Sequence, residues 1–97
     1  MDMEALMAQA QDLQTKIASA QDSLADMQVK GIAENGAVIV AMTGKYDVLS
    51  VNIRPETLSL DAEKVSKLVT DAYKDAKAKA DVLIDKVMSQ ITGGLSE

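Results

Sequence analysis

The side chains of this chain that could do chemistry are lysines and carboxylates, because its 97 residues include no histidine and no cysteine. The commonest general base, the thiolate nucleophile and most transition-metal ligands are therefore missing. The acids are dispersed among lysines, and no glycine-rich loop stands where a strand would lead into a helix, as phosphate-binding loops do. We therefore expect a binding protein and not an enzyme, with no catalytic residues, no metal site and no cofactor.

Lysine is concentrated in residues 61–86, which hold six lysines and six acids. Drawn as a helix, this segment places three lysines opposite its apolar positions: Lys67, Lys74 and Lys77. Three more flank one side: Lys64, Lys79 and Lys86. One interpretation is a solvated surface with local ion pairs, since Glu63/Lys67 and Asp75/Lys79 have the favourable four-residue spacing. The other is a phosphate-binding surface, formed when two copies of the chain set their lysine faces side by side.

Residues 2–28 predict a long amphipathic helix. Apolar residues recur there at alternating spacings of three and four, which is the heptad seam of a coiled coil: Met3, Leu6, Ala10, Leu13, Ile17, Ala20, Leu24 and Met27. At about 1.5 Å per residue the helix would be close to 40 Å long, too long to bury its whole seam against a small sheet. The segment is also acidic, because Lys16 is the only base among residues 1–29, against five acids.

Three short strands are expected next, at residues 29–34, 37–43 and 48–54. The pair Asn35-Gly36 suits the positive φ angles of a tight hairpin turn, and residues 44–47 turn the chain again, so the strands should form an antiparallel meander. The alternation places Val38, Val40 and Met42 on one face, and likewise Leu49, Val51 and Ile53. The opposite face, with Ile39, Ala41 and Val48, is half apolar and would suit a partner.

A second long helix is expected over residues 61–92. Pro55 ends the last strand, the side chain of Asp61 can cap the helix start, and Gly93-Gly94 suits a left-handed cap at its end. Its apolar positions recur every three or four residues: Val65, Val69, Ala72, Ala76, Ala80, Leu83, Val87 and Ile91. The order of helix, three strands and helix defines the α+β class, and residues 1–97 form a single domain.

The composition favours a homodimer. Apolar residues make up 47% of the chain, but Tyr46 and Tyr73 are its only aromatic residues, so a monomer would have a thin core beside two long apolar stripes. The net charge of −5 weighs against nucleic-acid binding if bulk electrostatics alone are considered. The N-terminus is acidic and no apolar run approaches the roughly 18 residues of a membrane span, so we expect a cytoplasmic protein without a membrane partner.

A set of short segments spans the strand region and the second helix: Val29-Lys30-Gly31, Glu34-Asn35-Gly36-Ala37-Val38, Met42-Thr43-Gly44, Asp71-Ala72-Tyr73-Lys74-Asp75-Ala76 and Met88-Ser89-Gln90-Ile91-Thr92-Gly93-Gly94-Leu95. In these segments, with their order and spacing, the sequence resembles the YbaB/EbfC family of bacterial nucleoid-associated proteins over nearly its whole length. The resemblance implies a homodimer whose helices project like tweezers and which binds double-stranded DNA with little sequence preference. It also implies a place in the nucleoid, a contribution to nucleoid organisation or gene regulation, and recombination or replication proteins as further partners.

On this hypothesis the DNA-binding candidates are six lysines that would contact the phosphate backbone: Lys16, Lys64, Lys67, Lys74, Lys77 and Lys79. The first helix departs from the family pattern, because members often carry more lysine there and this chain has Lys16 alone. A second hypothesis is therefore a coiled-coil interaction module, or adaptor, whose acidic first helix engages a protein partner with a basic surface.

Overall fold

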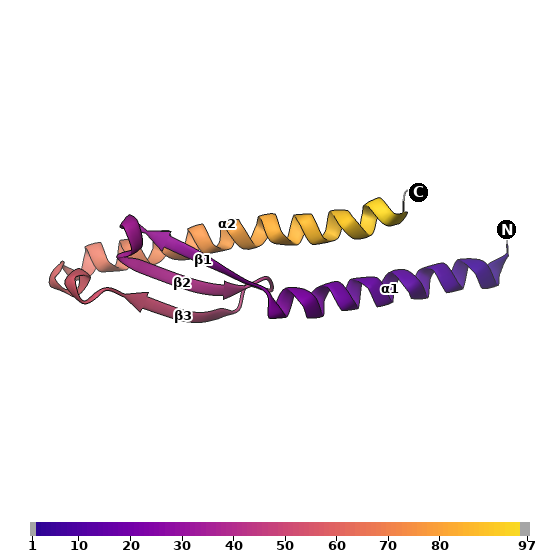
Figure 1. The fold of residues 1–97 in the computed structure, drawn as a ribbon, viewed down its shortest axis with the longest axis horizontal. Helices are drawn as coiled ribbons and strands as arrows, with labels where there is room; N and C mark the ends of the chain where they lie inside the picture. The colour runs from indigo at the N-terminus through magenta and orange to yellow at the C-terminus, as the bar shows by residue number, and fades with distance from the viewer. Residues whose placement is uncertain (1, 96–97) are drawn as a thin grey trace.

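The computed structural model describes residues 2–95, with the backbone alone for residues 92–95. Its helices and strands follow one another as α1 (Met3–Asp26), β1 (Gln28–Ala33), β2 (Val38–Thr43), β3 (Val48–Ile53) and α2 (Ala62–Leu95), with short 3-10 turns at Glu34–Gly36 and Pro55–Ser59. The predicted α+β class and element order are confirmed. The molecule measures 67 × 19 × 16 Å, because both helices run past the same end of a small sheet (Figure 1).

The sheet is an antiparallel meander in the order β1-β2-β3. The first turn lies where it was expected, and Asn35 and Gly36 have the predicted positive φ angles of 56° and 96°. The connection is nevertheless four residues long, since Ala33 pairs with Val38 and Ala37 has helical backbone angles. Residues 34–36 form a 3-10 turn, which is closed by the amide of Ala37 donating to the carbonyl of Glu34 at 3.2 Å.

A β-bulge changes the predicted face of Val48. Ala41 pairs with Ser50 but Met42 pairs with Val48, so Leu49 is left without a partner. Directly paired residues point to the same side of a sheet, so Val48 lies on the same side as Met42 and not beside Ile39 and Ala41. The prediction that Val48 belongs to the opposite face is therefore wrong, because the extra residue resets the alternation.

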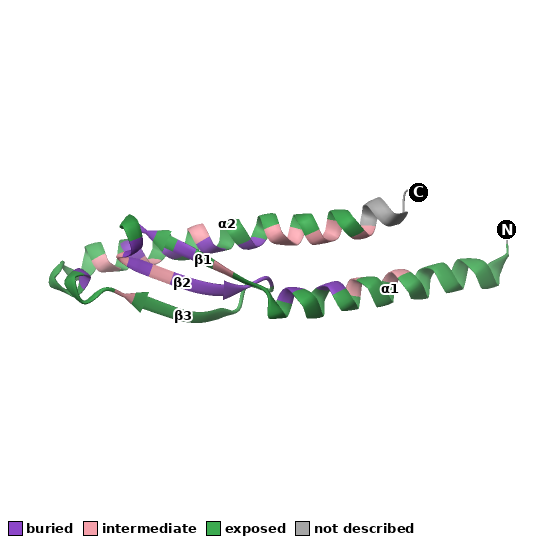
Figure 2. Ribbon diagram, in the orientation of Figure 1, coloured by how far each residue is buried: buried purple, intermediate pink, exposed green. Residues whose placement is uncertain are grey.

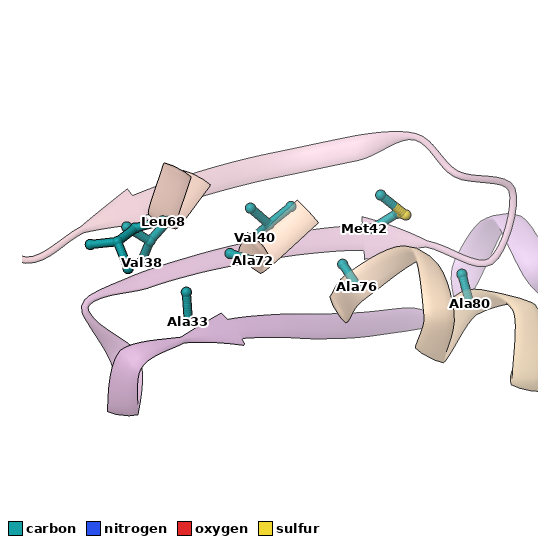
Figure 3. Packing of buried hydrophobic residues seen from close by; sticks show 8 residues of the cluster. All are labelled: Ala33, Val38, Val40, Met42, Leu68, Ala72, Ala76 and Ala80. Atoms are coloured by element: carbon teal, nitrogen blue, oxygen red, sulfur yellow. The ribbon is translucent and has the colours of Figure 1, made fainter. Parts of the chain in front are cut away.

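The core lies between α2 and the face of β1 and β2 that carries Val38, Val40 and Met42 (Figure 3). These three side chains are fully buried, as predicted from their alternation. Opposite them stand three small residues of α2, each 0% exposed: Ala72, Ala76 and Ala80. Gly31 of β1 completes this close packing, since a β-carbon there would lie 1.9 Å from the carbonyl oxygen of Ala72.

Each helix begins after an aspartate whose side chain caps its first turn. Asp2 accepts from the amide of Glu4 at 3.1 Å, and Asp61 accepts from the amide of Lys64 at 2.9 Å, which confirms Asp61 as the cap of the second helix. At its other end α2 continues through Gly93 and Gly94 to Leu95, three residues beyond the predicted end at residue 92. Glycine permits a left-handed cap without requiring one, and costs only about 1 kcal/mol within a helix.

Within residues 2–95, no helix combines the length and the apolar character that a membrane crossing requires.

Candidate nucleic-acid interface

Two helical arms extend beyond the sheet, and we define them as α1 before Ala20 and α2 after Ala80, the points where full burial of these helices stops. Figure 2 shows α1 exposed over most of its length. The predicted heptad seam is covered only in its second half: Leu24 is buried, Leu13 and Ile17 are half-buried, and Met3 and Leu6 remain 71% and 44% exposed. The seam therefore exists, but one chain alone leaves its distal part uncovered.

The balance of charge differs along the long axis of the molecule. The arms are acidic, because residues 3–19 hold Glu4 and Asp12 against Lys16, and residues 81–91 hold Asp81 and Asp85 against Lys86. By contrast, the segment of α2 from residue 64 to 79 lies over the sheet and holds five lysines and two aspartates. The positive surface is thus the part of α2 over the sheet, and not the arms.

Four of the six predicted lysines are exposed on this part of α2, and we call them the lysine row: Lys64, Lys67, Lys74 and Lys77. None of the four makes an ion pair with any residue that the structure describes, and the expected pair between Glu63 and Lys67 does not form. Lys64 and Lys67 also line a hollow of about 300 Å³ beside Glu34, Leu60 and Asp71. From residue 64 to residue 77 the row covers roughly 20 Å of helix axis.

The other two predicted lysines are engaged within the chain. The ammonium of Lys16 lies 3.1 Å from the carboxylate of Asp12 on α1. The ammonium of Lys79 donates to the carbonyl of Lys30 at 2.7 Å and lies 3.0 Å from the carboxylate of Asp75. The structure therefore does not bring all six lysines together, and it gives Lys79 a structural role.

Asp75 and Lys79 together close the free edge of β1. The amide of Ile32 donates to the carboxylate of Asp75 at 2.9 Å, so two outward polar groups of the strand are bound by α2 side chains. This backbone hydrogen bond, followed by the hydrogen bond from Lys79, lowers the pKa of Asp75 below its ordinary value. These two bonds take one donor and one acceptor of the edge, which makes it a poorer template for another strand.

The opposite edge is open and apolar. Val51 and Val48 pair with Val40 and Met42, so they lie on the core side of the sheet, yet α2 does not cover them. Val48, Leu49 and Val51 are 47%, 50% and 45% exposed, and every residue of β3 except Ile53 is exposed. We call these four residues, Val48, Leu49, Val51 and Ile53, the β3 strip. The sequence held one signal for it, since two adjacent apolar residues at 48 and 49 break a strict alternation.

Comparisons with known proteins give matches over nearly the whole chain. The model of the YbaB/EbfC DNA-binding family matches residues 1–95. A nucleoid-associated protein of Bradyrhizobium diazoefficiens is 38% identical over 95 residues, covering 97% of this chain and 90% of its relative. One from Bordetella avium is 41% identical over 90 residues, covering 93% and 83%. The crystal structure of an uncharacterized protein from Helicobacter pylori shares the fold, with a TM-score of 0.85 over 95% of this chain and 98% of that one at 15% identity.

Proposed function

The chain belongs to the YbaB/EbfC DNA-binding family, and on that basis we propose that it binds double-stranded DNA as a homodimer, through the phosphate backbone and with little preference for sequence. Its place is the nucleoid, where it contributes to nucleoid organisation or gene regulation. The observation that carries this proposal is the row of exposed lysines on α2, at positions 64, 67, 74 and 77, without acidic partners among residues 2–95.

Contact with phosphates, and not with bases, follows from the kind of side chain available. Lysine presents a compact, hydrated charge on a flexible stem, which suits a phosphate and reads no base edge by itself. The lysine row lies on a helix whose opposite face is packed on the sheet through Ala72 and Ala76, so the helix itself is held against the protein. This arrangement favours a surface that follows the backbone of a duplex over a helix inserted in its major groove.

A homodimer is supported by the contrast between the two edges of the sheet. The β1 edge is closed by Asp75 and Lys79, whereas the β3 strip exposes apolar side chains next to the core. Contiguous apolar surface of this kind marks an interaction site, and a second copy of the chain can cover it with the same strip. A dimer also doubles the number of lysines on one particle, which strengthens attraction to DNA despite the net charge of −5 per chain.

The test is the salt dependence of DNA affinity. Log affinity should fall linearly with log salt, with a slope of about −0.9 for each phosphate neutralised. Changing Lys67, Lys74 and Lys77 together to Gln removes three charges per chain, so the slope should flatten by up to about five units in a dimer. The matched control changes Lys30, Lys45 and Lys86 to Gln, which removes the same charge from outside the row. Equal flattening in the two variants would contradict the assignment.

The exposed distal half of the α1 seam supports the second hypothesis, in which the acidic α1 engages a basic protein. Recombination and replication proteins are the partners to test first. An association that survives nuclease treatment and is lost in Leu6→Ser would favour this function. An association that is lost on nuclease treatment depends on DNA and would favour the DNA-binding function.

A further inference from the structure

The turn between β2 and β3, residues 43–47, is tightly bonded within itself. The amide of Thr43 donates to the carbonyl of Asp47 at 2.9 Å, and the Thr43 hydroxyl accepts from the amides of Lys45 and Asp47 at 3.1 and 3.2 Å. Tyr46 has a φ of +68°, in the left-handed region that residues other than glycine seldom adopt. The bonds around it therefore hold Tyr46 in one defined position.

The same turn is fixed to α1. The amide of Gly44 donates to the carbonyls of both Leu24 and Met27, at 2.9 and 3.1 Å. A β-carbon at Gly44 would lie only 2.8 Å from the carbonyl oxygen of Leu24, so the turn and the end of α1 are in close contact. Tyr46 thus projects from a support that is anchored on both the sheet and α1.

From this support the hydroxyl of Tyr46 donates a short hydrogen bond to the carboxylate of Asp81 on α2. This hydrogen bond, together with the charges of Asp81 and Asp85, raises the pKa of Tyr46 above its ordinary value of 10.0. The phenol therefore stays protonated at neutral pH and remains a donor to Asp81.

Asp81 follows Lys77 by four residues, so the two side chains are neighbours on the surface of α2. Among the described residues, Lys16 and Lys79 each pair with the aspartate four residues before them. Lys67, with Asp71 four residues after it, makes no such pair. Lys77 makes no such pair with Asp81 in the described chain, and Asp81 is instead bonded to Tyr46. Tyr46 thereby orients the carboxylate that lies four residues after Lys77.

We propose that Tyr46 is a positioning residue of the DNA-binding surface, which holds the Asp81 carboxylate and so leaves Lys77 free to meet a phosphate. The consequence for DNA rests on the proposed function, whereas the effect on Lys77 does not. Removing the Tyr46 hydroxyl lets Asp81 pair with Lys77. An exposed pair of this spacing reduces the fraction of Lys77 side chains that are unpaired by roughly twofold. With two copies of Lys77 in a dimer, DNA affinity at low salt falls about fourfold.

The first experiment titrates a fluorescent duplex with four forms of the protein: the parent, Tyr46→Phe, Asp81→Asn and the double variant. Tyr46→Phe is expected to lose about fourfold in affinity at low salt, with the loss shrinking as salt rises. In the Asp81→Asn background the same change should have no effect, because no carboxylate remains to be released. Tyr73→Phe is the matched control, since Tyr73 is equally exposed, at 40%, and its hydroxyl makes no hydrogen bond with the described residues.

A second experiment needs no DNA. Acetylation by an N-hydroxysuccinimide ester, followed by mass spectrometry, gives the reactivity of Lys77 relative to Lys74. An ion pair protects the amine from acetylation. Tyr46→Phe should therefore slow the acetylation of Lys77 by roughly twofold, whereas the double variant with Asp81→Asn should react at the parent rate.

Unchanged Lys77 reactivity in Tyr46→Phe, or a double variant as weak on DNA as Tyr46→Phe, would overturn the inference and leave the DNA-binding proposal intact. Failure of the parent protein to bind duplex at low salt would instead overturn the proposed function, and the acetylation rates would still decide the role of Tyr46. Thermal unfolding of each variant separates a loss of fold from both outcomes.

Discussion

Replacement of Gly31 by alanine tests whether α2 is seated on β1 as closely as the structure indicates. The added β-carbon would lie 1.9 Å from the carbonyl oxygen of Ala72 and 2.4 Å from the amide nitrogen of Ala76. Ordinary van der Waals contact begins near 3.4 Å, so α2 must retreat by about 1.5 Å, the difference between 3.4 and 1.9 Å. A gap of only 0.5–1 Å already forfeits about a quarter to a half of a dispersion contact.

The cost should therefore be large for a single methyl group. Overpacking of cores typically costs about 1–3 kcal/mol, and we expect at least the upper value of about 3 kcal/mol here, because the obstructing atoms belong to a helix backbone and cannot rotate away. Against a typical total of about 5–15 kcal/mol for a domain, this change populates the unfolded state measurably.

Urea unfolding at one fixed protein concentration measures the effect, as a lower midpoint with an unchanged slope. Lys30→Ala, at the preceding exposed position, is the control and should change stability by less than about 0.5 kcal/mol. Ala76→Gly combined with Gly31→Ala should not restore stability, because it leaves the two backbone contacts in place. A Gly31→Ala variant as stable as the parent, or one rescued by Ala76→Gly, would refute the argument.

Two further predictions concern the edges of the sheet. Val51→Lys places a charge in the β3 strip and should reduce the mass in light scattering from twice the chain mass of 10.3 kDa to a single chain, whereas Ser50→Lys, on the other face, should leave the dimer intact. Asp75→Asn weakens the bond to the Ile32 amide and the pair with Lys79, and should cost about 1 kcal/mol at neutral pH. Because folding lowers the pKa of Asp75, its contribution is present above the unfolded value near 4 and is lost as pH falls through the folded value. The stability of Asp75→Asn, followed by urea titration, should therefore fall less than that of the parent below about pH 4, and parallel curves would contradict this cause.

The sequence predicted the elements of the fold because their signals are local. The heptad spacing of α1, the alternation of Val38, Val40 and Met42, and the cap at Asp61 each depend on neighbours a few residues apart. The alternation of residues did not give the length of the first turn, because residues 34–36 form a 3-10 turn that is closed by the amide of Ala37 on the carbonyl of Glu34. The bulge at Leu49 likewise arises from pairing between strands and not from either strand alone.

The candidate site was less predictable, because the availability of a lysine depends on contacts distant in sequence. Lys79 has a solvent-facing pattern and an acid at the favourable spacing, but nothing in the sequence indicates its bond to the carbonyl of Lys30, 49 residues away. The helical projection of residues 61–86 correctly predicted that Lys67, Lys74 and Lys77 are exposed. It gave no information on Tyr46, which meets Asp81 only because the fold brings the second turn to α2.

These contacts also explain how an acidic chain can present a basic surface. The net charge of −5 counts every carboxylate equally, but Asp12 and Asp75 are each paired with a lysine outside the row, Lys16 and Lys79. Glu4 and Asp85 lie on the arms, where distance and salt screening weaken their effect on phosphates bound over the sheet. What decides binding is therefore the number of exposed lysines on one surface that are not held in ion pairs. On this argument, releasing one bonded aspartate beside the lysine row should weaken DNA binding more than adding one acid at the far end of α1, although only the added acid changes the net charge.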